Sequence, residues 1–413
     1  INVKMANIED LPPEVLTFLF TFLEGKDLAA VAKVSKTFCE ASRVESIWQK
    51  LCIRDYNVSL IDSPLQITFQ ELYQKVLYKY GHTLGLWQAE ISHYGGLIQV
   101  KWTGQSLLCV QHQPPINPHV DKPLRAKPLF SIKINYDKEV EILCLQGFFG
   151  PHRLVVNQTE RDAFSSKCLE RAKHQHPLGK QAEYQAWLIN ETEERVQNIL
   201  LHGHELLLMK FLITSQYDNS FMFSRIHLPR PRENVILQPG LFKGNYGSHG
   251  VEIVKFDYTS DLTKLEGLKI TGDPNVPALQ KTIIVDMQRP MMLSVEQQDS
   301  INTLSMIDTP HLPDARLDRL PPQPFIVPPD CNDRFYSSSR PSPKSCKARF
   351  HTKAQVAGHE FTNPTFIPGH FIIFDENTVG HIWLELHSFS VYCRVMEDFN
   401  STDIDPGAAA SVI

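Results

Sequence analysis

GLWQAEISHYGGLIQV, residues 85–100, and GLFKGNYGSHGVEIV, residues 240–254, follow one pattern. Each begins Gly-Leu-aromatic, passes through a Tyr-Gly pair and a further glycine, and ends in a strand whose apolar side chains alternate. Glycine permits bends and positive φ angles, so such turns are typical of barrel corners. Two divergent copies are too few to establish a repeat array, but they favour a β-barrel.

Alternating or short apolar runs continue through the chain beyond residue 84. They include LIQVKW, SLLCVQ, LFSIKINY, EVEILCLQ, ELLLMKFLI (205–213), FMFSRIHL, VEIVKFDY, LKIT, TIIVD, FIIF and HIWLELHSFSVY. About a dozen short strands separated by turn residues predict an all-β barrel or sandwich. Helical spacing of apolar residues near 181–200 predicts one accessory helix among them.

The first 80 residues predict helices instead. LPPEVLTFLFTFL (11–23) has helical apolar spacing, with Pro12-Pro13 in its first turn and Gly25 after its end. Asp27 suits the N-cap of a second helix, and VESIWQKLC (44–52) predicts a third. A stripe at i, i+3, i+4, i+7 from Phe69 to Tyr80 predicts a connecting helix. The fold class is therefore α+β.

Composition narrows the functions that are open to the chain. Its 413 residues are 42% hydrophobic and 21% charged, with a formal net charge of −5. No long basic run is present, so we expect no nucleic-acid partner. No stretch reaches the ~18 consecutive apolar residues of a membrane helix, and no apolar signal segment opens the chain. Eight scattered cysteines indicate a reducing compartment: the cytoplasm, with the nucleus as a second candidate.

We divide the chain into four parts: residues 5–56 and 57–83 as helical modules, 84–400 as the β-barrel domain, and 401–413 as a disordered tail. Residues 310–345 are rich in proline and serine, which predicts a flexible stretch inside the β domain.

The helical module 5–56 resembles the F-box family. The shared features are an LP-x-E-x-L opening, an aromatic-Leu end to the first helix, a DL start to the second and a late tryptophan, Trp48. This resemblance implies docking on the Skp adaptor of a cullin–RING ubiquitin ligase. Helix-on-helix burial would use an apolar set, part of which can equally be the module's own core: Leu11, Pro12, Val15, Leu16 and Leu19.

The rest of the chain, to about residue 400, is similar to one family of F-box substrate receptors. The segments that carry this similarity are LGLWQAEISHYGGLIQV, FKGNYGSHGVEIV, LKITGDPNVPA and GHIWLELHSFSVY. The resemblance implies a non-catalytic receptor whose barrel binds the C-terminal tails of D-type cyclins and of amidated or damaged proteins. It also implies roles in the cell cycle and the DNA damage response.

Cys144, His152, Cys168 and His174 form the pattern C-x7-H-x15-C-x5-H. Two thiolates and two imidazoles suit a tetrahedral structural zinc. The spacing is not that of a zinc finger, so the pattern alone favours a buried cysteine with assorted surface histidines. The family resemblance implies zinc at this place, with His176 as an alternative fourth ligand.

Catalytic patterns are weak. Ser248 and His249 are adjacent, but YGSHG is not G-x-S-x-G, and neighbouring side chains of an extended segment point to opposite faces. We therefore expect no catalytic site. Two alternatives stay open: a hydrolase that uses this Ser-His pair, and a barrel that binds a small apolar ligand, since the Gly-Leu-Trp opening is faintly lipocalin-like.

We expect the substrate pocket around FKGNYGSHG and LKITGDPN, where glycines allow close backbone approach and free N–H groups can bind a chain end. Cationic side chains there suit a terminal carboxylate, whereas Asp273 would accept hydrogen bonds from a terminal amide. Without the resemblance, simple barrel-corner turns would be the better interpretation. The candidate residues are Lys243, Tyr246, Ser248, His249, Lys269 and Asp273.

Overall fold

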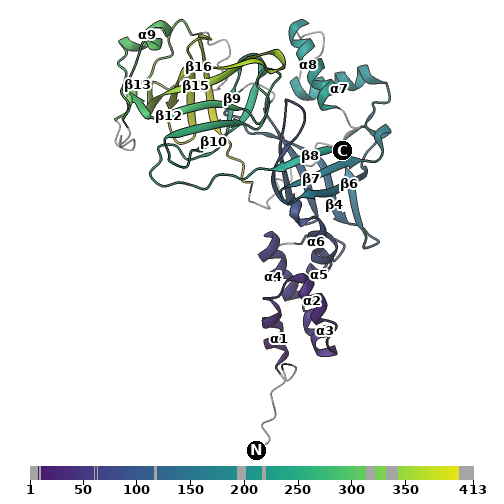
Figure 1. The fold of residues 1–413 in the computed structure, drawn as a ribbon. Helices are drawn as coiled ribbons and strands as arrows, with labels where there is room; N and C mark the ends of the chain where they lie inside the picture. The colour runs from purple at the N-terminus through teal and green to yellow at the C-terminus, as the bar shows by residue number, and fades with distance from the viewer. Residues whose placement is uncertain are drawn as a thin grey trace, which may run out of the picture.

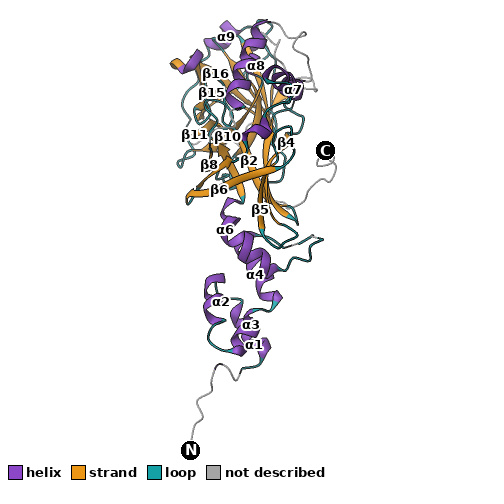
Figure 2. Ribbon diagram, turned by 90° about the vertical axis from the view of Figure 1, so that its right-hand side faces the viewer, coloured by secondary structure: helices purple, strands orange, loops and turns teal. Residues whose placement is uncertain are grey.

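The computed structural model describes residues 8, 11–59, 61–62, 64–115, 119–192, 201–215, 220–312, 321–331 and 343–399. It confirms the predicted α+β class, with helices at the N-terminal end and β-barrels beyond them (Figures 1 and 2). In these ranges no helix combines the length and apolar character needed to cross a membrane.

Four helices, not three, form the N-terminal module: α1 (Pro13–Phe20), α2 (Gly25–Val31), α3 (Lys36–Ser42) and α4 (Glu45–Tyr56). Gly25 begins α2 instead of ending α1, and Glu24, not Asp27, is its N-cap. The extra helix α3 begins at the N-cap Ser35, whose hydroxyl accepts a hydrogen bond from the Phe38 N–H. The sequence prediction missed α3 because KTFCEAS is too short and too polar to give a helical stripe of apolar residues.

The connecting helix has the predicted position but an irregular middle. α5 (Phe69–Leu72) opens with a capping box between Thr68 and Glu71, a π-helical turn (Tyr73–Leu77) follows, and α6 (Tyr78–Tyr80) completes it. Its buried side chains belong to the same apolar core as Leu16 of α1 and Phe130 of the first barrel. The helical modules therefore pack continuously onto that barrel (Figure 1).

The first barrel is an eight-stranded antiparallel meander that closes when β8 pairs with β1. Its strands are β1 (Gly85–Ala89), β2 (Leu97–Trp102), β3 (Ser106–Gln113), β4 (Arg125–Ile134), β5 (Val140–Cys144), β6 (His152–Glu160), β7 (Ala163–Cys168) and β8 (Phe221–Arg225).

The second barrel also has eight strands and closes when β18 pairs with β9. Its strands are β9 (Gly240–Asn245), β10 (Val251–Tyr258), β11 (Lys264–Lys269), β12 (Lys281–Met291), β15 (Ala348–Gly358), β16 (Thr362–Ile373), β17 (Thr378–Trp383) and β18 (Ser388–Arg394). The short pair β13 (Gln323–Pro324) and β14 (Ser345–Cys346) lies between β12 and β15 in the chain.

Residues 84–400 thus contain two closed barrels where we expected one. The two similar glycine-rich segments are the first hairpin of each: β1 with β2, and β9 with β10. One copy therefore opens each barrel. A single-barrel prediction failed because strand patterns report alternation and not which strand closes on which.

ELLLMKFLI is helical, which corrects its prediction as a strand. It lies in α8 (Leu201–Thr214), which packs against α7 (Lys180–Thr192), the predicted accessory helix. A short continuous apolar run suits a buried strand or a helix equally, and contact with Tyr184 and Leu188 of α7 decides for the helix.

The described part of the proline-rich stretch is packed and not simply flexible. Phe325 is buried. The Gln323 side-chain amide donates a hydrogen bond to the Met291 carbonyl and accepts one from the Leu293 N–H. A small helix, α9 (Ile301–Ser305), adds Ile301 and Leu304 to the same apolar layer outside the second barrel. Residues 313–320, 332–342 and the tail 401–413 lie outside the described residues.

Candidate functional site

Four predicted metal ligands come together at one end of the first barrel. Cys144 ends β5, His152 begins β6, Cys168 ends β7 and His174 lies in the loop after it. One donor atom from each lies within 4.8 Å of all the others. His152 Nε2 is 3.0 Å from His174 Nε2 and 3.1 Å from Cys168 Sγ. Separations of this size fit the corners of a tetrahedral S₂N₂ site.

The surroundings of the cluster orient one of its donor atoms and favour the neutral forms of Cys144 and His174 while no metal is bound. His152 Nδ1 lies 2.9 Å from the Gly150 carbonyl, which orients the ring so that Nε2 faces the cluster. Burial raises the pKa of the Cys144 thiol to about 12, and burial with the neighbouring His152 lowers the pKa of His174 to about 4. The alternative ligand His176 instead packs on Phe148 and accepts a bond from the Leu178 N–H. The structure thus selects His174.

A cavity of about 390 Å³ lies beside this cluster. Its apolar floor is the open end of the first barrel, including Ala89, Ile98, Phe130 and Phe223. Loops of the second barrel form the opposite wall, and α7 and α8 border it. Cys144, Cys168 and His174 are part of the lining, so the cluster lies next to the space that a ligand would occupy.

Loop contacts join the barrels at the cavity. Gly95 bridges Thr271, the Gly272 N–H bonds the Tyr94 carbonyl at 3.0 Å, and the Ala278 N–H bonds the His93 carbonyl at 2.9 Å. The loop between β1 and β2 is therefore fixed against the loop after β11. The cavity wall is built by both barrels together.

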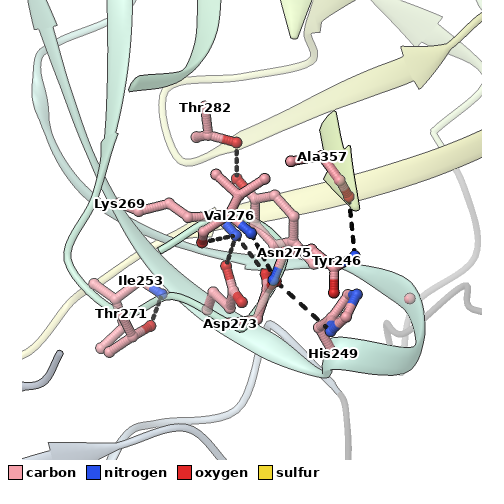
Figure 3. A network of polar contacts seen from close by, with 12 residues as sticks. Tyr246, His249, Ile253, Lys269, Thr271, Asp273, Asn275, Val276, Thr282 and Ala357 are labelled. Carbon is pink, nitrogen blue, oxygen red and sulfur yellow. Dashed lines mark hydrogen bonds and ion pairs between the residues drawn. The ribbon is translucent and has the colours of Figure 1, made fainter. Parts of the chain in front are cut away.

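A buried ionic cluster lies at the cavity wall on the side of the second barrel (Figure 3). Lys269 Nζ is 2.7 Å from Asp273 Oδ2 and 2.6 Å from Glu252 Oε2, and it donates to the Val276 carbonyl at 3.1 Å. Only 1–6% of these three side chains is exposed. One ammonium thus faces two carboxyl groups in a poorly solvated place, where both cannot readily stay ionised.

The two carboxyl groups respond oppositely. Burial raises the pKa of Glu252 well above its usual value, and the neighbouring Asp273 adds to the shift. Burial opposes ionisation of Asp273 too, but Lys269, Glu252 and His249 lower its pKa. Asp273 Oδ1 also accepts from the backbone N–H groups of residues 275 and 276, at 2.7 and 2.9 Å. These shifts favour ionisation of Asp273 before Glu252.

The predicted pocket residues separate into two places. Lys269 and Asp273 form the cluster, Tyr246 stacks on Lys269 with its ring centroid 4.3 Å from Nζ, and His249 Nδ1 lies 3.8 Å from Asp273. Lys243 points elsewhere and donates to the Lys122 carbonyl. The side chain of Ser248 is outside the described residues. Asp273 Oδ1 also holds the turn at residues 273–276 through two backbone N–H groups, so the turn interpretation is confirmed and the pocket stays a prediction.

Glu252 was missed by the sequence prediction. Its signal is the alternation of VEIVKFDY, which puts residue 252 on the same face as Val254 and Phe256, both fully buried. A carboxyl group on a core-facing position of a strand is unusual and marks a special environment.

The predicted adaptor set divides between core and surface. Leu16 is completely buried inside the helical module, whereas Val15 and Leu19 are 40% and 39% exposed. Phe18, Phe22 and Val34 are more exposed still and were not in the predicted set. An apolar surface on α1 is thus available to a partner, with Leu16 holding the helix in place beneath it.

Comparisons with known proteins agree with these features. An F-box-like family model matches residues 8–54, and the model of the cyclin D1 binding domain matches residues 223–398. The chain is 37% identical to F-box only protein 31 of Rattus norvegicus, over 96% of this chain and 86% of the relative. It is 35% identical to F-box only protein 31 of Homo sapiens, over 96% and 85%. The resemblance predicted from the sequence is confirmed.

Proposed function

The chain belongs to the F-box only protein 31 family, and from this premise we propose that it is the substrate-recognition subunit of a Skp–cullin–F-box ubiquitin ligase that binds the C-terminal tails of its substrates. One observation carries the tail-binding part of the proposal: the cavity between the barrels ends at the buried carboxyl groups of Asp273 and Glu252, which both contact the Lys269 ammonium. The matching cyclin D1 binding domain model supports D-type cyclins among the substrates.

The cluster suits a terminal amide better than a terminal acid. A primary amide offers N–H donors to the Asp273 carboxylate and a carbonyl oxygen to the proton of Glu252. A terminal carboxylate has no donor and is repelled by Asp273. We therefore expect proteins that end in an amide to bind most tightly. A D-type cyclin tail that ends in a free carboxylate would need further contacts in the cavity.

Catalysis is not needed from this chain. The helical module binds the Skp adaptor, the barrels bind the tail, and proximity to a ubiquitin-loaded enzyme elsewhere in the ligase promotes transfer. At the metal cluster we propose a structural zinc held by Cys144, His152, Cys168 and His174. The apolar floor of the cavity keeps a small apolar ligand as the second candidate. Bound lipid after purification would favour it.

The test of tail recognition compares peptides that are identical except for a terminal amide, a terminal acid or an internal position of the same segment. We expect amide peptides to bind tightest and Asp273→Asn to reduce the discrimination by about tenfold. Asp257→Asn is the control. Asp257 lies on β10 of the same barrel, and its carboxylate pairs with Arg232. Equal binding of all three peptides by the unchanged protein would place recognition elsewhere.

The adaptor test uses two neighbouring leucines of α1. Leu19→Asp should abolish adaptor capture while helicity is kept, because its side chain is partly exposed. Leu16→Asp should unfold the helical module itself, since it would bury a charge. Tyr136→Asp, at an exposed turn of the first barrel, is the control. Normal adaptor binding by Leu19→Asp would show that α1 is not the docking helix.

A further inference from the structure

The end of the cavity below α7 and α8 is lined by cationic side chains, whereas the Asp273 end is lined by carboxyl groups. Lys127 of β4, Glu191 of α7 and Lys210 of α8 all line the cavity there, together with the Gln113 amide. Arg125, two residues before Lys127 on the same strand, donates to the Asn190 carbonyl at 2.8 Å. Three cations therefore surround a single carboxylate.

Glu191 already has its partners. Lys210 Nζ and Gln113 Nε2 each donate to it at 3.3 Å, and only 13% of its side chain is exposed. Burial opposes its ionisation, but Lys210, Arg125 and Lys127 lower its pKa. One negative charge thus faces three positive ones, which leaves two in excess at this end.

Lys127 is the least satisfied of the three cations. Within the described residues its ammonium donates no hydrogen bond, whereas Arg125 and Lys210 both have acceptors. Burial lowers the pKa of Lys127, and Glu191 only partly opposes this shift. An ammonium that lines a cavity and donates no hydrogen bond is stabilised by an anion brought to it.

We propose that Lys127 and Lys210 form a subsite for an acidic side chain of the substrate tail, upstream of the terminal residue that the Asp273 end receives. This inference rests on the proposed function. A tail that enters past α7 and α8 would place its terminal group at the acidic end and its upstream residues between the lysines. The opposed charges would then fix its direction, because a reversed peptide would bring its acidic side chain to Asp273.

The experiment measures binding of fluorescent peptides that share one terminal amide and carry Asp or Asn at one upstream position at a time. At one or two positions, Asp should improve binding about tenfold over Asn at low salt, and less at high salt. Lys127→Gln and Lys210→Gln should each remove most of this gain, so that each variant binds the Asp and Asn peptides about equally. Lys133→Gln is the matched control, on the same strand but paired with Glu141 outside the cavity.

A charge exchange sharpens the test: Lys127→Glu should prefer the peptide with Lys at the sensitive position. A phosphorylated serine that outbinds Asp more than tenfold there would overturn the assignment to a carboxylate side chain in favour of a phosphate. Equal binding of all Asp and Asn peptides would overturn the subsite and leave the proposed function intact. No binding by any tail would overturn both.

Discussion

The first barrel, β1–β8, and the second, β9–β18, are closed by the same set of contacts. Gly85 and Gly240 open them at positive φ angles of 113° and 149°, and a guanidinium nitrogen lies 3.0 Å and 2.8 Å from where the respective Cβ would stand. Arg225 lies over the Trp87 ring at 4.0 Å, and Arg394 over the Phe242 ring at 4.5 Å. Each arginine also donates to backbone carbonyls just before the opening glycine.

The interiors differ. Aromatic side chains such as Phe256, Phe371 and Tyr392 fill the second barrel up to its buried ionic cluster. The first barrel has Trp87 and Phe164 at its helical end but opens into the cavity at the other. The second barrel is therefore filled and forms one wall of the cavity, whereas the first barrel is open to it. The proposed site lies where the two barrels meet.

The largest expected effect comes from the Cys/His cluster, which only the first barrel has among the described residues. Cys144→Ser should lose zinc, measured by elemental analysis, and cost more than about 3 kcal/mol of stability, because the loop after β7 would lose its anchor. Cys346→Ser removes a buried thiol of the second barrel region and should keep the zinc. A folded protein without zinc in metal-replete medium would contradict the metal assignment.

The next effect tests the shared closure. Arg225→Met and Arg394→Met should each reduce the free energy of unfolding by about 2–4 kcal/mol, since each leaves backbone carbonyls without a charged donor. Urea titration followed by tryptophan fluorescence measures both. If the closures are equivalent, the two losses should agree within about 1 kcal/mol. A negligible loss for one variant would show that its barrel closes by strand pairing alone.

The smallest effect concerns the ionic cluster of the second barrel. Because the pKa of Glu252 is raised on folding, its contribution to stability is complete below about pH 4.5 and is lost as the pH rises toward the folded-state pKa. Relative to Glu252→Gln, the wild-type protein should lose stability as the pH rises above about 5, at up to about 1.4 kcal/mol per pH unit. Glu266→Gln, an outward-facing carboxylate paired with Lys281, should show no such difference. A parallel pH dependence for Glu252→Gln would refute the protonated state.

The sequence predicted elements whose signals are local. The helical module, most strands and the cluster of two cysteines and two histidines follow from periodicity, caps and the family resemblance. Pairing between distant strands leaves no local trace, so the second closure at β18 and β9 was missed. Glu252 lies 17 residues before Lys269 and gains its chemistry only through their contact in the barrel. Lys127 likewise acquires its role from α7 and α8, which are distant in sequence.

The π-helical connection between the modules also has a mechanical consequence. Lys75 bonds the Lys138 carbonyl at 2.8 Å, Lys138 pairs with Glu71 at 3.1 Å, and one apolar core extends from α1 into the first barrel. The helical modules and the first barrel are therefore held together as one stiff unit between the proposed adaptor surface and the cavity. On the proposed function, a substrate is anchored by its last residues. The distance from this anchor to any other substrate residue grows by at most ~3.3–3.6 Å per extended residue. Which lysines receive ubiquitin would depend on their contour distance from the chain end.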